Sequence, residues 1–254
     1  DLNAADEAHH DETEAQAHLA ECKRLIASDA TLSAYCAAFT RHASPEDLFH
    51  YTGAELASLI RLVFARSAKR APGETLIEIF DPSAQDAGFA RSETVIVAVN
   101  EDMPFLYDSC INEVRAKGCH VAAAFHPVVP ESRDADGRRG QAKTAIRESV
   151  IVLALDGALD ADRVNALHAG LAQVFDDVRA SVRDWKAMLA RLAQTTEQLK
   201  ANPPQIPAPE LSESLAFLDW LADNHFTFLG ARDYAFSDEG GGRLDAIQIG
   251  RAHV

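Results

Sequence analysis

One short stretch of the sequence holds the residues whose types and spacing are best suited to chemistry. Residues 99–109 read Val-Asn-Glu-Asp-Met-Pro-Phe-Leu-Tyr-Asp-Ser, and they join a predicted strand to a predicted helix. The free N–H groups and the positive dipole end at the start of a helix favour a carboxylate or another anion. Since Asp102 and Asp108 could hold an ammonium group, a zwitterionic amino acid is a chemically sensible ligand. The candidate effector-binding residues of this stretch are Asn100, Glu101, Asp102, Met103 and Asp108.

A simpler interpretation of the same stretch needs no ligand. Asp102 could cap the helix through its carboxylate, and Asp108 could be an ordinary surface residue. Taken alone, the residue types favour this simpler interpretation.

His126 is a further candidate for the same site. It precedes Pro127 near the end of the next predicted strand, close to where the 99–109 stretch should fall if the two strands pair. A ring N–H there could bind a ligand carboxylate, although a hydrogen-bonded histidine at a strand end is an equally good interpretation. Arg147 and Glu148 introduce a third strand, and we expect them to pair across the sheet rather than to do chemistry.

Familiar catalytic and cofactor motifs are missing from the sequence. It contains no GxGxxG after a strand, no P-loop, no HExxH, no GxSxG and no Cys/His cluster with metal-ligand spacing. We therefore expect no catalytic residue, no metal site and no bound cofactor in this chain.

The amino-acid composition argues against several classes of protein and of partner. The 254 residues are 47% apolar and 25% charged, which is ordinary for a folded chain. There is no run of eighteen apolar residues and no basic-then-apolar start, so we expect a cytoplasmic protein. A formal charge of −15 disfavours nucleic acid and anionic membrane as partners. The four cysteines form no CxxC pair, and we interpret them as buried thiols.

The elements that must position the candidate site follow from periodicity. Residues 1–72 are predicted to be a helical region, with Ser44 and Thr52 as helix N-caps, and residues 74–80 read as a strand. From residue 94 the order is strand, helix, strand, strand, helix, which matches the first five elements of a ferredoxin-like βαββαβ unit. These five elements are predicted at residues 94–99, 105–117, 119–129, 148–155 and 161–200.

The last of these helices is longer than the unit needs. Apolar positions recur at alternating three- and four-residue spacing from Val164 to Leu199, as in a packed seam, and an unbroken helix would be about 60 Å long. We expect the excess to pack on the N-terminal helices, on a neighbouring subunit or on further domains. Residues 201–209 read as a proline-rich linker, and residues 210–254 as the start of a further, truncated domain.

Five segments, in order along the chain, resemble a known family. They are residues 100–109, 126–128, 147–149, 178–185 and 217–230, the last of which reads Phe-Leu-Asp-Trp-Leu-Ala-Asp-Asn-His-Phe-Thr-Phe-Leu-Gly. Together they resemble the amino-terminal part of bacterial large-subunit NAD-specific glutamate dehydrogenases. No single segment is specific enough by itself. This sequence has Glu101 where the family pattern leads us to expect an aspartate.

The resemblance implies a parent enzyme that oxidatively deaminates L-glutamate to 2-oxoglutarate and ammonia with NAD. The catalytic domain and the NAD-binding fold are then expected outside this chain. In that family the amino-terminal half is similar to ACT domains, βαββαβ modules that often pair and bind amino acids at their interfaces. The expected fold is therefore α+β, with an ACT-like domain over residues 73–200. The final strand of that unit is not evident, and residues 74–80 are a candidate for its place in the sheet.

Three functions are compatible with these observations. The first is a regulatory module that binds an amino-acid effector at residues 100–108. The second is a structural arm whose 164–199 seam assembles a homo-oligomer and binds no ligand. The third is a free-standing amino-acid sensor, which the apparent start of a new domain after residue 210 disfavours. In the first two, the rest of the same polypeptide is an expected partner.

Overall fold

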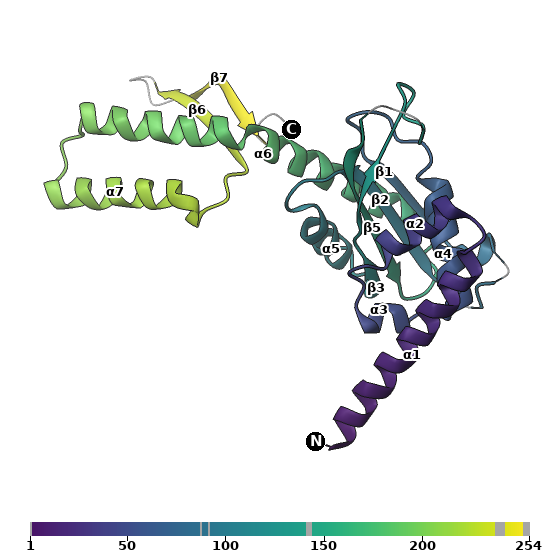
Figure 1. Cartoon of the computed structure of the whole chain (residues 1–254). Coiled ribbons are helices and arrows are strands. Elements are labelled where there is room, and N and C mark those ends of the chain that lie inside the picture. Colours follow the sequence, from purple (N-terminus) through teal and green to yellow (C-terminus); the bar gives the residue numbers. More distant parts are fainter. Residues whose placement is uncertain (1, 87, 91, 141–143, 237–241, 251–254) are drawn as a thin grey trace. The chain divides into compact units, whose positions relative to one another are not determined.

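The computed structural model of the chain describes residues 2–86, 88–90, 92–140, 144–236 and 242–250. The chain divides into two compact units, one up to Phe175 and one from Asp176 onward. The first unit holds five helices, a sheet and the start of a long sixth helix, α6. The rest of α6 belongs to the second unit (Figure 1).

Helices open the first unit, and their starts follow the capping residues that the sequence predicts. The Asp29 carboxylate accepts the Leu32 N–H, and Ser44 caps the next helix, whose first residue is Pro45. Thr52 and Glu55 form a complete capping box. The first helix begins at Leu2. The four helices are α1 (Leu2–Ile26), α2 (Ala30–Phe39), α3 (Pro45–Phe49) and α4 (Gly53–Arg66).

The sheet is antiparallel, and β5 lies at its centre with β2 along one side and β3 and β4 along the other. β1 pairs with the free side of β2, so the order is β1-β2-β5-β3. The strands are β1 (Leu76–Phe80), β2 (Thr94–Glu101), β3 (Val121–Phe125), β4 (Val128–Glu131) and β5 (Ile146–Leu155).

This order explains the missing last strand of the βαββαβ unit. Such a unit places its last strand beside its first, and here the first strand is β2. β1 occupies that position, although it comes from the amino-terminal side. The prediction that residues 74–80 take this place is confirmed.

The predicted single strand over residues 119–129 is wrong. It is interrupted at His126-Pro127, and its two parts, β3 and β4, both pair with β5. Pro127 has no N–H to donate to the ladder, and it contributes only its carbonyl, which accepts the Val150 N–H. The pairing with β5 keeps the same register on both sides of this break, and His126 lies at the break, beside the candidate site.

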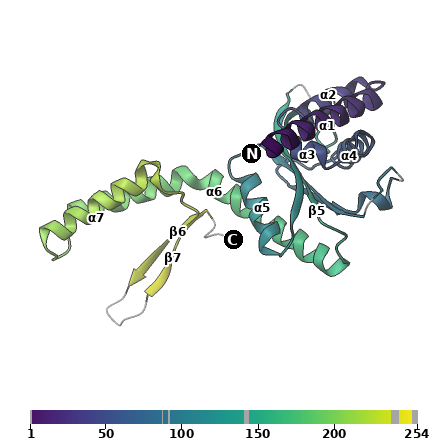
Figure 2. The same ribbon diagram turned by 90° about the horizontal axis from the view of Figure 1, so that it is seen from below.

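Both faces of the sheet are covered. α1 to α4 lie on one face, while α5 (Leu106–Ala116) and the start of α6 (Ala161–Ala201) lie on the other (Figures 1 and 2). Every described β2 residue before Glu101 is buried, and so is β5 from Glu148 onward. This is why both strands read as continuous β-branched runs rather than as alternating patterns.

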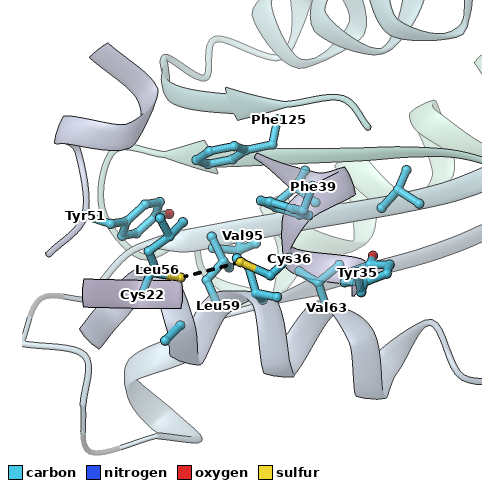
Figure 3. Packing of buried hydrophobic residues seen from close by; sticks show 14 of the residues in the cluster. Cys22, Tyr35, Cys36, Phe39, Tyr51, Leu56, Leu59, Val63, Val95 and Phe125 are labelled. Carbon is cyan, nitrogen blue, oxygen red and sulfur yellow. Dashed lines mark hydrogen bonds between the residues drawn. The ribbon is translucent and has the colours of Figure 1, made fainter. Parts of the chain in front are cut away.

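The core under α1 to α4 is closely packed (Figure 3). Alternate β2 residues, among them Val95, contact a cluster that includes Phe39, Tyr51 and Phe125. Fully burying each such side chain stabilises the fold by roughly 1.5–3 kcal/mol. The same core holds the thiols of Cys22 and Cys36, whose Sγ atoms lie 4.0 Å apart. Burial is confirmed for Cys22, Cys36 and Cys110, whereas Cys119 is partly exposed.

In the second unit, the rest of α6 packs on a hairpin of its own unit. Arg191 forms an ion pair with Asp233, Ser181 Oγ donates to the Leu229 carbonyl, and Asp184 accepts the Gly250 N–H. Part of the excess of α6 therefore packs on the region after residue 210 that the sequence analysis assigns to a further domain, and its packing on a neighbouring subunit stays a prediction. The unit's other elements are α7 (Ala208–Trp220), the π-helical turn Leu221–His225, β6 (Gly230–Phe236) and β7 (Gly242–Gly250).

The domain limits read from the sequence stay a prediction. In the structure, residues 202–207 join α6 to α7 without helix, within the span of the predicted linker. The division at residue 175 falls inside α6, where no composition change marks it.

Candidate functional site

The candidate site lies where β2 ends and α5 begins. Asn100 is buried in β2 opposite Ser149 of β5, and its side-chain oxygen accepts a hydrogen bond from Thr75 Oγ1 at 3.3 Å. Glu101 is exposed, and Met103 is half-buried. Asn100 therefore contributes to the packed base of the site, whereas the residues after it lie nearer to solvent.

Asp102 does not cap the helix. Its N–H donates to the Arg147 carbonyl at 2.9 Å, and its carboxylate lies 2.9 Å from the Arg147 guanidinium. Both interactions join the end of β2 to the start of β5. The ligand-free interpretation of Asp102 as a helix cap is therefore not what the structure shows.

The N-cap position of α5 is instead Phe105, with φ of 73° and no side-chain hydrogen bond to the helix. Among the described residues it is the one non-glycine with positive φ. A left-handed conformation costs a non-glycine residue roughly 1–2 kcal/mol, and such strain clusters at ligand sites. The side chain of the N-cap residue therefore accepts no hydrogen bond from the first N–H groups of α5.

His126 completes the site from the far end of β3. Its ring stacks on Tyr107 of α5 at 4.8 Å between centroids, and its Nε2 lies 2.7 Å from Ser149 Oγ. Burial lowers the pKa of His126, while the carboxylates of Asp102 and Asp108 act in the opposite direction. The net direction favours a neutral ring at neutral pH.

The structure thus brings the sequence candidates to one end of the sheet. Asp102 and Asp108 both lie near enough to His126 to act on its charge, and Asp108 is exposed in the first turn of α5. That these residues bind a ligand stays a prediction. Sequence reasoning missed Tyr107 and Ser149, although Ser149 could have been found from the strand register that places it opposite Asn100.

A buried ion cluster lies directly beside the site, on Glu148. Both Arg70 and Arg133 donate hydrogen bonds to its carboxylate, and all three side chains are at most 5% exposed. Burial opposes ionisation, but the two guanidinium groups outweigh it and lower the pKa of Glu148. The expectation that Arg147 and Glu148 make pairs rather than do chemistry agrees with these contacts. The sequence did not identify Arg70 and Arg133 as the partners.

Two further features are absent from the described part of the chain. Within residues 2–250, apart from the gaps given above, no three His, Cys, Asp or Glu side chains are arranged to hold a metal ion. Among the helices of that same part, none is both long and apolar enough to span a bilayer.

Comparison with known proteins adds an independent observation. Residues 35–171 match the family described as the ACT1 domain of glutamate dehydrogenase. The chain is 30% identical over 176 residues to the NAD-specific glutamate dehydrogenase of Pseudomonas aeruginosa, and 31% identical over 186 residues to that of Halomonas elongata. These alignments cover 66% and 70% of this chain, but only 11% and 12% of the two relatives.

Proposed function

This chain belongs to the glutamate dehydrogenase ACT1 domain family, and we propose that it is a regulatory region of a NAD-specific glutamate dehydrogenase that senses an amino-acid effector. The resemblance of five sequence segments and the similarity to two such dehydrogenases support this parentage. In the proposed parent, L-glutamate and NAD give 2-oxoglutarate, ammonia and NADH. That chemistry is carried by other parts of the enzyme, which acts in the cytoplasm, and this chain contributes no catalytic residue and binds no NAD.

One observation carries the sensing proposal: the start of α5 is a helix N-terminus without a side-chain cap, preceded by Phe105 in a left-handed conformation. Exposed N–H groups at the positive end of a helix are suited to a carboxylate. Asp102 and Asp108 flank this helix start, and carboxylates are suited to an ammonium group. The two kinds of charge in an amino acid are thus matched by neighbouring groups of this chain.

His126 and Asn100 have supporting roles in the proposed site. A neutral imidazole can donate one hydrogen bond and accept another, and Ser149 Oγ already engages Nε2. Tyr107 holds the ring parallel to its own. Asn100 joins the end of β2 to Thr75, which directly precedes β1, through the hydrogen bond from Thr75 Oγ1.

The proposal is tested by calorimetric titration of the chain with a panel of L-amino acids. We expect at least one to bind, and we expect Asp108→Ala to weaken its binding at least tenfold, because an ammonium group loses its counter-charge. The matched control is Asp136→Ala, which removes an exposed carboxylate from a turn outside the site. If no amino acid binds at millimolar concentration, the sensing proposal is wrong.

A second candidate function is assembly, with the site binding nothing. It is favoured by the second unit, where α7 has no buried residue among those described. Several large apolar side chains of that unit are about half exposed, namely Trp185, Phe217, Trp220, Phe226, Leu229 and Tyr234. Phe217 and Trp220 among them stack on each other, and adjoining exposed apolar side chains mark surfaces that pack on a partner. This candidate predicts that the chain forms a homo-oligomer or packs on the rest of its polypeptide.

A further inference from the structure

A cavity of about 440 Å³ opens at the edge of the sheet, where the end of α2 meets β4. Pockets for small molecules have volumes of roughly 300–1,000 Å³, so this one is large enough for a metabolite. It shares only His126 with the proposed effector residues. The cavity is lined by Ala38, Arg41, His42, His126, Val128, Pro130 and Arg147.

All polar side chains that line this cavity are basic. Arg41 and Arg147 supply guanidinium groups, His42 and His126 supply imidazoles, and no lining residue is acidic. The chain as a whole has a formal charge of −15. A concave surface with only basic polar side chains is therefore the opposite of the average surface of this protein, and it should attract anions locally.

The guanidinium groups of Arg41 and Arg147 have N–H donors left with which to bind a ligand. Arg147 pairs with Asp102, but its side chain is 74% exposed, and a guanidinium has five N–H donors, which one carboxylate does not exhaust. Across the part of the chain that the structure describes, neither Arg41 nor His42 is in an ion pair with a carboxylate.

The helix dipole explains only part of this arrangement. Arg41 and His42 directly follow α2, and cations are favoured near the negative C-terminal end of a helix. That effect gives no reason for Arg147, which comes from β5, to line the same cavity. Two arginines from separate elements, together with the apolar side chains in the same lining, are suited to oxygen anions on a small carbon skeleton.

We propose that this cavity binds a small dianion, with oxygens held by Arg41 and Arg147 and a body that contacts Val128 and Pro130. The shared chemistry is two negative charges on carboxylate or phosphate oxygens. The ligand needs no ammonium group, so its chemistry differs from that of the amino-acid effector proposed at the start of α5, although His126 belongs to both sites.

The test is calorimetric titration of the whole chain, at low ionic strength, with inorganic phosphate and separately with succinate. We expect binding of at least one of them. We expect Arg41→Gln and Arg147→Gln each to weaken that binding about tenfold, since each removes one charged donor pair. Arg163→Gln is the matched control, because it removes an exposed arginine of α6 outside the lining, and it should bind as the unchanged chain does.

The arms of this experiment separate the possible results. Binding of phosphate alone assigns the site to phosphate esters, and binding of succinate alone assigns it to dicarboxylates. The anion site can stand even if no amino acid binds, because Arg41 and Arg147 are not among the proposed effector residues. The proposal is wrong if neither anion binds at millimolar concentration, or if Arg41→Gln binds as tightly as the unchanged chain. Circular dichroism of each variant verifies that it is folded.

Discussion

At the scale of single residues, Glu148 joins three parts of the first unit. Its carboxylate receives hydrogen bonds from Arg70, which follows α4, and from Arg133, which follows β4. Arg133 also donates to the carbonyls of Ser67 and Gly137. A carboxylate buried to this extent is tolerated because the two guanidinium groups compensate its negative charge. Removing the carboxylate would leave two buried cations unpaired.

We therefore predict that Glu148→Gln lowers the free energy of unfolding by about 3 kcal/mol at neutral pH. The pKa of Glu148 is lowered, so its stabilisation is present above the ordinary glutamate pKa of 4.5 and is lost as the pH falls through the folded value. Urea unfolding followed by circular dichroism measures both effects. The variant should lose less stability than the unchanged chain between neutral pH and the acid range.

Glu21→Gln is the control for this prediction. Glu21 pairs with Arg24 on the surface of α1, where both side chains are well exposed, so its removal should change stability by less than about 1 kcal/mol. Equal effects of the two substitutions would contradict the assigned role of Glu148.

At the scale of elements, the caps decide where the core helices start. α4 carries Leu56, Leu59, Ile60 and Val63 into the core. Its start is held by the reciprocal hydrogen bonds between Thr52 and Glu55. The direction in which α4 enters the core therefore depends on a few polar atoms at one end.

We predict that Thr52→Ala lowers the free energy of unfolding by about 1 kcal/mol, because the Glu55 N–H loses its acceptor. The midpoint of thermal unfolding should fall by roughly 2–4 °C, which circular dichroism measures. Thr144→Ala is the matched control, since Thr144 is exposed and lies outside any helix or strand. An unchanged midpoint for Thr52→Ala would mean that packing alone sets the start of α4.

At the scale of the whole molecule, the two units bury their apolar side chains to different extents. The first unit has a core on each face of its sheet, whereas α7 in the second unit buries none of its described residues. Trp185 belongs to the predicted 164–199 seam, yet it is 46% exposed. An apolar seam that is only partly covered within its own unit is available to a partner.

If assembly uses this surface, the chain should be a dimer or larger oligomer by light scattering, and Trp185→Glu should shift it toward the monomer. The physical reason is that a carboxylate placed in an apolar interface loses its water without gaining a counter-charge. Lys186→Glu is the control, since the neighbouring exposed side chain is already charged. A monomer at all concentrations would contradict the assembly function, and it would leave effector sensing unaffected.

The sequence by itself determined where most helices and strands form, because the residues that indicate each element lie close together in the chain. Ser44 and Thr52 marked helix starts through side chains that bond to N–H groups three residues away, and the β-branched runs marked the buried strands. The resemblance of ordered segments likewise indicated the family, which the match over residues 35–171 shows. The split at Pro127 was also local, but it was not recognised.

Only the tertiary structure decided which residues meet. These contacts are the pairing of β1 with β2, the hydrogen bonds from Arg70 and Arg133 to Glu148, and the cavity lined by Arg41 and Arg147. The residues that they join are between 15 positions apart, as for Arg133 and Glu148, and 106 positions apart, as for Arg41 and Arg147. No local periodicity encodes such distances, since they depend on how whole elements pack. The conformation of Phe105 is a further case, because it follows from how the chain turns between β2 and α5 rather than from the preference of phenylalanine.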